Sequence, residues 1–204
     1  MPLTESFGAR VTAEPGRTLE SLVPAPLDAL VLKEKLVVLR GFGAQSPDAF
    51  LAWCRAFPGR RVLEWEFGAM MEMKERRDPQ NYLFSRERVP FHWDGAFHRV
   101  PTFLMFYCVE APLPGAGGET LFCDTGKAWA AASPEEKARL ARVELTYETA
   151  KLAHYGGLIS APLVQRHPET GRTILRYAEP VETALNPVSM KVSGIPEAEQ
   201  KYLA

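Results

Sequence analysis

Two residues of one short segment, His92 and Asp94, carry side chains that could bind a metal ion. In an extended strand, residues two positions apart project from the same face, so this imidazole and this carboxylate can converge. One imidazole and one carboxylate supply two of the three protein ligands in the facial triad of non-haem iron(II) oxygenases. A buried histidine–aspartate pair joined by a hydrogen bond is the alternative, and the spacing alone leaves both interpretations open.

A second candidate motif, Gly117-Gly118-Glu119-Thr120, follows further along the chain, after an apolar run and a proline-rich turn. Two adjacent glycines let the backbone approach a ligand closely, and the Thr120 hydroxyl can hydrogen-bond a carboxylate. A β-turn with an incidental threonine explains the same residues, so this motif by itself does not establish a binding site.

The elements that must position these motifs are short, because 17 prolines and 15 glycines interrupt the chain. Such interruption favours a β-rich fold. Helices are expected to begin at Ser46, at Ser133 and near Pro196, because each position has an N-cap residue or a proline suited to the first turn. The expected fold class is α+β, with a double-stranded β-helix (jelly roll) core, helical inserts and an incomplete C-terminus. Its strands are expected at residues 36–42, 103–109, 121–123 and 173–177.

The composition is that of a single globular domain over residues 1–204, with 46% apolar and 24% charged residues. The net charge of −1 gives no indication of nucleic acid or of an anionic membrane as a partner. No apolar stretch suits a secretory signal or a membrane span. The cysteines Cys54, Cys108 and Cys123 lack CxxC spacing and suit a reduced, cytoplasmic protein, with Cys108 and Cys123 expected to be buried.

Taken together, the segments resemble taurine-dioxygenase-like enzymes, which depend on Fe(II) and 2-oxoglutarate. The order and spacing of FHWDGAF, PTFLMFYCVEAPLPGAGGETLFCD, the helix at Ser133 and QRHPETGRTILRY carry this resemblance. Within the family, the chain is most similar to the isonitrile-modifying dioxygenases of pyoverdine-cluster and paerucumarin-type biosynthesis. That similarity is carried by LRGF, WEFGAMMEM, VPFHWDG, AHYGGLISAPLVQRHP, ILRYAEP and LNP. It covers the chain from about residue 36 onward and implies one taurine-dioxygenase-like domain.

The resemblance implies that His92 and Asp94 are the first two iron ligands and that Thr120 hydrogen-bonds the distal carboxylate of 2-oxoglutarate. It implies hydroxylation, desaturation or oxidative decarboxylation of a small organic substrate, with release of succinate and CO₂ from the cosubstrate. The substrate class it suggests is an amino-acid-derived isonitrile or a related carboxylate in secondary metabolism. Tyr82 and His154 are candidate residues of the substrate pocket.

The family pattern also includes a late histidine ligand and an arginine that pairs with 2-oxoglutarate, and neither has a counterpart in the chain. His98 is a poor substitute, because four residues of strand separate it from Asp94 by about 13 Å unless the chain reverses at Gly95. Arg172 and Arg176 precede the position of the family's arginine and suit the surface or a sheet edge.

Other interpretations therefore stay open. The chain could be a catalytically silent, truncated or degenerate member of the family that acts at most as a binding module. A cupin-like metal-binding protein with other ligands is a third interpretation. The expected partner is a small-molecule substrate, and a homo-oligomer formed through unpaired sheet edges is compatible with the sequence.

From the ligand count we expect the 204-residue chain to bind Fe(II) and 2-oxoglutarate weakly and to show no substantial turnover. A facial triad needs a third ligand, and the missing arginine would contribute about 1.5–3 kcal/mol through a charged hydrogen bond. A chain extended through a late histidine and arginine should recover binding and turnover. Succinate formation and oxygen uptake, compared at equal Fe(II) and 2-oxoglutarate, measure this. Substrate-dependent turnover by the shorter chain would contradict it and indicate His154 or His98 as third ligand.

Overall fold

The computed structural model describes residues 7–43, 45–65, 68–150, 157–185 and 187–203. The chain separates into two compact units, and each is described by itself. Unit 1 comprises Met1–Met70 and Phe103–Asp124, and unit 2 comprises Met71–Thr102 and Thr125–Ala204. The expectation of a single domain over residues 1–204 stays a prediction.

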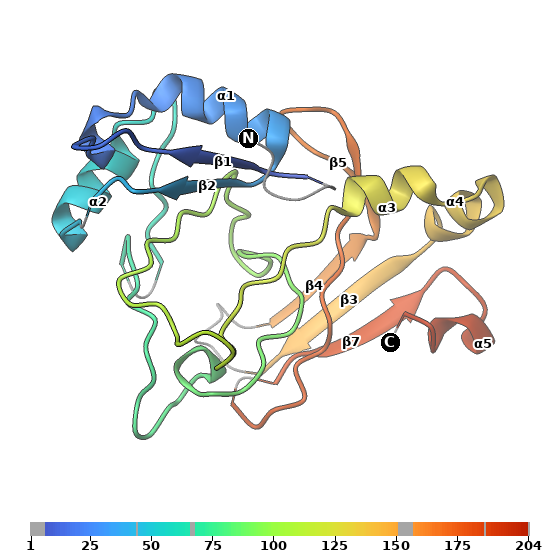
Figure 1. Cartoon of the computed structure of the whole chain (residues 1–204). Helices are drawn as coiled ribbons and strands as arrows, with labels where there is room; N and C mark the ends of the chain where they lie inside the picture. The colour runs from blue at the N-terminus through green and yellow to red at the C-terminus, as the bar shows by residue number, and fades with distance from the viewer. Residues whose placement is uncertain (1–6, 44, 66–67, 151–156, 186, 204) are drawn as a thin grey trace. The chain divides into compact units, whose positions relative to one another are not determined.

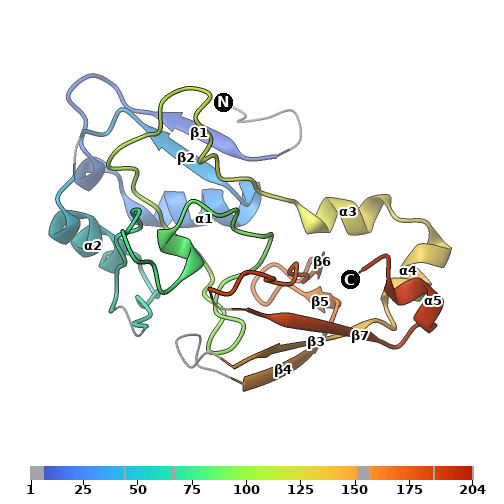
Figure 2. The same ribbon diagram turned by 90° about the horizontal axis from the view of Figure 1, so that it is seen from below.

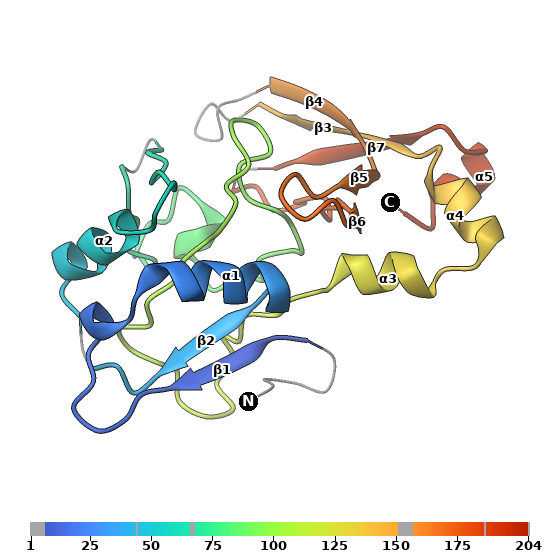
Figure 3. The same cartoon turned by 90° about the horizontal axis from the view of Figure 1, so that it is seen from above.

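Unit 1 contains a parallel pair of strands, β1 (Ala9–Thr12) and β2 (Val37–Arg40). The connection between them runs through η1 (Leu19–Ser21) and α1 (Pro24–Glu34), as a parallel pair requires, and α1 lies beside the two strands (Figure 1 and Figure 3). Strand β2 lies within the expected residues 36–42, which confirms that prediction.

Helix α2 (Pro47–Arg55) begins where the sequence predicts it. The Ser46 hydroxyl accepts a hydrogen bond from the Ala49 N–H at 3.2 Å, and Pro47 occupies the first helical position, where it has no donor to lose. Trp53 on this helix is buried against Phe57 with their rings 5.1 Å apart and nearly perpendicular. These two side chains form the core of unit 1 together with Leu19 and Phe42.

Residues 103–124, all of which the structure describes, form no helix or strand. The strands expected at 103–109 and 121–123 are therefore wrong. Cys108 and Cys123 are exposed, so their expected burial is also wrong. Apolar sequence is compatible with a core strand, but a strand also requires a neighbouring backbone for its hydrogen bonds. None of the ladders in the described part of the chain includes this segment.

The start of this segment still has the burial alternation of a strand. Leu104 and Phe106 are 49% and 66% exposed, whereas Met105 and Tyr107 face the core of unit 1. The Tyr107 hydroxyl accepts a hydrogen bond from the Gln45 N–H at 2.9 Å. One face of the run is thus anchored, and the other presents apolar side chains to solvent.

Unit 2 contains a three-stranded antiparallel sheet in the order β4–β3–β7, and a hairpin formed by β5 and β6 lies over one of its faces (Figure 2 and Figure 3). The strands are β3 (Glu144–Thr149), β4 (Gly157–Pro162), β5 (Val164–Arg166), β6 (Thr173–Leu175) and β7 (Ser189–Ser193). The helices are η2 (Tyr82–Phe84), α3 (Thr125–Ala131), α4 (Pro134–Leu140) and α5 (Glu197–Gln200).

Alternate residues of β3 form the core of unit 2. Leu145 is 1% and Tyr147 3% exposed, and Leu145 pairs across the sheet with Ala161 on one side and Val192 on the other. The other buried members of this cluster are Val143, Leu163, Val192 and Ile195. The core therefore lies between the sheet and the hairpin that covers it.

Three further sequence predictions are confirmed in unit 2. Helix α4 has the complete capping box, with reciprocal hydrogen bonds between Ser133 and Glu136 at 3.2 and 2.8 Å. Strand β6 occupies the first part of residues 173–177, and α5 follows Pro196.

The mixed α and β character is likewise confirmed. The described residues form three separate small sheets, and no closed sheet occurs among them. No helix in the described ranges is long and apolar enough to cross a bilayer.

His167 organises the turn between β5 and β6. Its backbone N–H donates to the Arg172 carbonyl and its carbonyl accepts from the Gly171 N–H, both at 2.8 Å. The ring Nδ1 accepts weak hydrogen bonds from the N–H groups of Glu169 at 3.4 Å and Thr170 at 3.3 Å. Because Nδ1 accepts, it must be unprotonated, and protonation of the ring would break both contacts.

We expect acid to weaken this turn. Burial lowers the pKa of His167 below its ordinary value of 6.5; Glu169 opposes that shift, and Arg172 and Arg176 reinforce it. A depressed folded-state pKa gives stability that is present above 6.5 and is lost as the pH falls through the lower, folded-state value. The amide oxygen of His167→Asn accepts at every pH. The unfolding free energy of this variant should therefore decline less steeply than that of the wild type as the pH falls below 6.5. Urea unfolding at several pH values measures the two slopes, and equal slopes would contradict this role.

Candidate metal site

The structure places His92 and Asp94 in an irregular segment of unit 2 that continues into a turn over residues 94–97. The expectation that they lie on a strand is therefore wrong. Pro90 lacks a backbone donor, and Gly95 has a φ of 76°, so this segment does not keep a regular ladder. The two side chains nevertheless face each other, with His92 Nε2 3.8 Å from Asp94 Oδ1. Their role as metal ligands stays a prediction.

The orientation of the His92 ring is set by its own backbone neighbourhood. Nδ1 lies 2.8 Å from the Pro90 carbonyl oxygen. A carbonyl can only accept, so Nδ1 carries the proton, and in the neutral ring Nε2 then holds a lone pair directed toward Asp94. A histidine that donates one ring N–H to a backbone carbonyl has the arrangement that is usual for metal-bound histidines.

The distance between the two side chains argues against a simple hydrogen-bonded pair. At 3.8 Å, Nε2 and Oδ1 are too far apart for a hydrogen bond. Two donors held at about 2.0–2.1 Å from one ion, at a right angle, would lie about 3 Å apart. A small side-chain rotation therefore suffices to place both on a single cation, and the donor set of one imidazole and one carboxylate fits Fe(II).

The electrostatics of Asp94 also involve Tyr82. Burial raises the pKa of the Asp94 carboxyl, and His92 partly offsets this increase. Burial likewise raises the pKa of Tyr82, with the charge of Asp94 as a second cause. Tyr82 is 7% exposed and belongs to η2 of the same unit. It is thus within electrostatic range of the candidate site, and its contact with substrate stays a prediction.

Trp93, between the two candidate ligands, packs into the core of unit 2. Its ring meets that of Tyr147 edge-on, with centroids 5.3 Å apart and an interplanar angle of 78°. The Arg176 guanidinium lies over the Trp93 ring, 6.0 Å from its centroid. Trp93 is partly buried against this core, and the packing of its indole holds the middle of the motif in place.

The chain does reverse at Gly95, since the His98 N–H donates to the Gly95 carbonyl at 3.1 Å. Even so, no group of three or more His, Cys, Asp or Glu side chains suited to a metal ion occurs in the described residues. The reversal therefore does not bring His98 into a ligand set with His92 and Asp94. His154 lies outside the described residues.

Thr120 is exposed and belongs to unit 1, whereas His92 and Asp94 belong to unit 2. The expectation that it lines the same site therefore stays a prediction. Close approach of this backbone to a ligand likewise stays a prediction, and a Cβ atom at Gly117 would meet nothing within 4 Å. Gly118 has a φ of 87°, and a Cβ atom there would lie 2.9 Å from the Pro112 ring.

The chain belongs to the taurine catabolism dioxygenase TauD, TfdA family, whose model matches residues 1–203. It is thus a member of the Fe(II)/2-oxoglutarate-dependent oxygenases, and it is related to isonitrile-modifying enzymes of secondary metabolism.

Three relatives document this relationship. The chain is 41% identical over 199 residues to the 3-((Z)-2-isocyanoethenyl)-1H-indole synthase of Fischerella ambigua, covering 95% of this chain and 72% of that enzyme. It is 34% identical to the tyrosine isonitrile desaturase of Erwinia amylovora, covering 97% and 69%. The crystal structure of PvcB from Pseudomonas aeruginosa superposes with a TM-score of 0.77 at 30% identity, covering 97% and 67%. A second PvcB structure, described as an Fe, alpha-ketoglutarate dependent oxygenase from an isonitrile synthetic pathway, gives a TM-score of 0.74.

The turn that follows Asp94 should depend on glycine. At Gly95 a Cβ atom would collide with the Arg99 carbonyl oxygen, whereas at Gly171, which also has a positive φ, it would meet nothing within 4 Å. Both alanine substitutions force a left-handed backbone, at a cost of about 1 kcal/mol or more. Gly95→Ala should cost a further 1–3 kcal/mol or so, because the collision must be relieved by moving backbone. Equal losses of unfolding free energy in Gly95→Ala and Gly171→Ala, measured in urea, would show that the turn tolerates a side chain.

Proposed function

We propose that this chain uses Fe(II) and 2-oxoglutarate to oxidise an amino-acid-derived isonitrile, or a related carboxylate, in secondary metabolism. Hydroxylation, desaturation and oxidative decarboxylation are all within the chemistry of this family. The proposed partner is the small-molecule substrate, and a cytoplasmic location remains our expectation from the sequence.

One observation carries the metal part of this proposal. His92 Nδ1 donates to the Pro90 carbonyl, so in the neutral ring the Nε2 lone pair faces a carboxylate oxygen of Asp94 at 3.8 Å. Two acceptors that face each other repel unless a cation or a proton lies between them. A divalent ion satisfies both, and imidazole plus carboxylate is the ligand pair that non-haem iron oxygenases share.

In this proposal the residues of the chain have separate tasks. His92 and Asp94 would hold the iron, which when bound supplies the site where 2-oxoglutarate and oxygen are consumed. Thr120 would donate its hydroxyl hydrogen to the distal carboxylate of 2-oxoglutarate. Tyr82, buried within electrostatic range of Asp94, would form part of the wall against the substrate.

The substrate class is supported by the names of the relatives. The Fischerella enzyme is an isocyanoethenyl-indole synthase, and the Erwinia enzyme is a tyrosine isonitrile desaturase. Both names refer to an isonitrile compound, and this chain is 41% and 34% identical to these enzymes over nearly its whole length. The finer architecture follows in the same way. We propose that the three small sheets belong to a double-stranded β-helix, which the superposition on PvcB supports.

Substitution of either proposed ligand should weaken metal binding. We expect His92→Gln and Asp94→Asn each to reduce Co(II) affinity more than about tenfold, because each removes one of few protein ligands. His98→Gln is the matched control, since His98 lies in the same segment and forms no ligand set with them. Calorimetric titration measures affinity, and succinate release with a tyrosine-derived isonitrile measures turnover. Equal affinities in all three variants would overturn the metal site, and metal binding without succinate would favour the silent binding module.

A further inference from the structure

The segment that carries His92 is held by a residue distant in sequence, Glu179. Glu179 follows β6 and lies opposite Phe91, the immediate neighbour of His92. Its backbone N–H donates to the Phe91 carbonyl at 2.8 Å. Its side-chain Oε2 accepts from the Phe91 N–H, also at 2.8 Å. A single residue thus satisfies the N–H and the C=O of Phe91.

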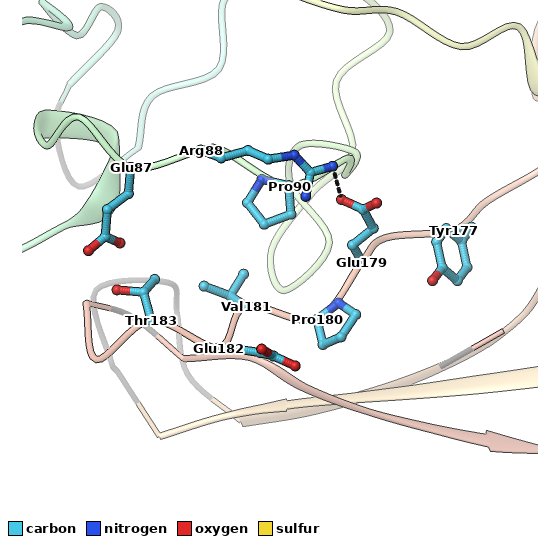
Figure 4. A pocket seen from close by; sticks show the side chains of 9 residues that line it. All are labelled: Glu87, Arg88, Pro90, Tyr177, Glu179, Pro180, Val181, Glu182 and Thr183. Carbon is cyan, nitrogen blue, oxygen red and sulfur yellow. Dashed lines mark hydrogen bonds and ion pairs between the residues drawn. The ribbon is translucent and has the colours of Figure 1, made fainter. Parts of the chain in front are cut away.

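The same carboxylate oxygen has a second partner. Arg88 Nη2 lies 2.7 Å from Glu179 Oε2 (Figure 4). Arg88 and Glu179 line a hollow of about 410 Å³, with Pro90 on the side of Arg88 and Val181 on the side of Glu179. The Arg88 side chain is 67% exposed, so solvent screens this ion pair and its contribution is small. The hydrogen bond to the Phe91 N–H is therefore the contact that matters for the motif.

Glu179 is itself anchored to the core of unit 2. The Tyr147 hydroxyl accepts from the Ala178 N–H at 2.9 Å and donates to the Ala178 carbonyl at 3.2 Å. Tyr147 is 3% exposed and lies on β3, in the middle of the sheet. Glu179 is therefore anchored through its neighbour Ala178 to a central strand of the sheet. Its hydrogen bonds hold Phe91, one residue from the candidate ligand, at a fixed position relative to that strand.

We propose that Glu179 is a positioning residue, which fixes the Pro90–Phe91 backbone so that the His92 ring keeps its bond to the Pro90 carbonyl and its Nε2 toward Asp94. This inference rests on the proposed role of His92 and Asp94 as metal ligands. Between Arg88 and His92, Pro90 has no N–H, and its carbonyl is used by His92. Among the described contacts, the only backbone hydrogen bonds that hold this stretch are those to Glu179.

Two conservative variants separate positioning from charge. Glu179→Gln keeps the length of the side chain and an acceptor oxygen but loses the negative charge. Glu179→Asp keeps the charge but is one methylene shorter and no longer reaches the Phe91 N–H. If Glu179 positions the motif, Glu179→Asp is impaired and Glu179→Gln is tolerated. If its charge is what matters, the order is reversed. Glu182→Ala is the matched control, because Glu182 lines the same hollow and takes no part in the hydrogen bonds described above for Phe91, both of which go to Glu179.

The first measurement needs no metal. Nitrogen-15 NMR of the His92 ring, assigned by loss of its signals in His92→Gln, reports which nitrogen carries the proton. We expect the Nδ1-protonated tautomer in the wild-type protein, Glu179→Gln and Glu182→Ala, and a mixture of tautomers in Glu179→Asp. The wild-type tautomer retained in Glu179→Asp would overturn the proposal.

The second measurement is the affinity for Co(II), followed by visible absorption. Glu179→Asp should bind at least tenfold more weakly, as is typical when a partner outside the ligand set is lost, and the other two variants within about twofold of wild type. Circular dichroism melting confirms that each variant is folded. Wild-type protein that fails to bind Co(II) but shows the expected tautomers would refute the proposed function and leave the positioning role standing. Equal affinity in Glu179→Asp and wild type would contradict the positioning role itself.

Discussion

The candidate metal site depends on the hydrogen bonds and the ring packing of Tyr147. Its hydroxyl forms hydrogen bonds with the N–H and the carbonyl of Ala178, and its ring packs edge-on against Trp93. Burial raises the pKa of this hydroxyl to about 12, so it remains protonated and able to donate at any physiological pH. One side chain in the middle of the sheet therefore contacts both the segment that contains Glu179 and the segment that contains the candidate ligands.

The geometry of His92 and Asp94 is informative because the two groups do not bond to each other. A structural histidine–aspartate pair would place a ring N–H within hydrogen-bonding distance of the carboxylate. Here the ring donates its proton to the Pro90 carbonyl, and the carboxylate lies 3.8 Å from the other nitrogen. Burial also raises the pKa of Asp94, so the local environment opposes its negative charge. A cation between the two groups would relieve that opposition, which is why the arrangement suits a metal site.

Unit 1 shows how an apolar run can lack the structure that its pattern predicts. Met105 and Tyr107 face the core, whereas Leu104 and Phe106 are exposed, so the period of a strand is present. The run has no paired neighbour among the described strands, and without such a neighbour alternation alone does not produce a ladder. The chain spans 67–72% of the length of the relatives compared with it.

Features that depend on local interactions could be predicted from the sequence alone. The N-caps at Ser46 and Ser133 are hydrogen bonds that span three residues. His92 and Asp94 do face each other at 3.8 Å, but in an irregular segment and not on the strand that their spacing predicted. Which apolar runs become strands, and how the segment with His92 and Asp94 is held, depend on contacts between distant parts of the chain. Phe91 is fixed by Glu179, 88 residues later, through a contact that no local pattern encodes. Backbone pairing and buried polar contacts require a partner from another segment, and folding of the whole chain determines which segment supplies it.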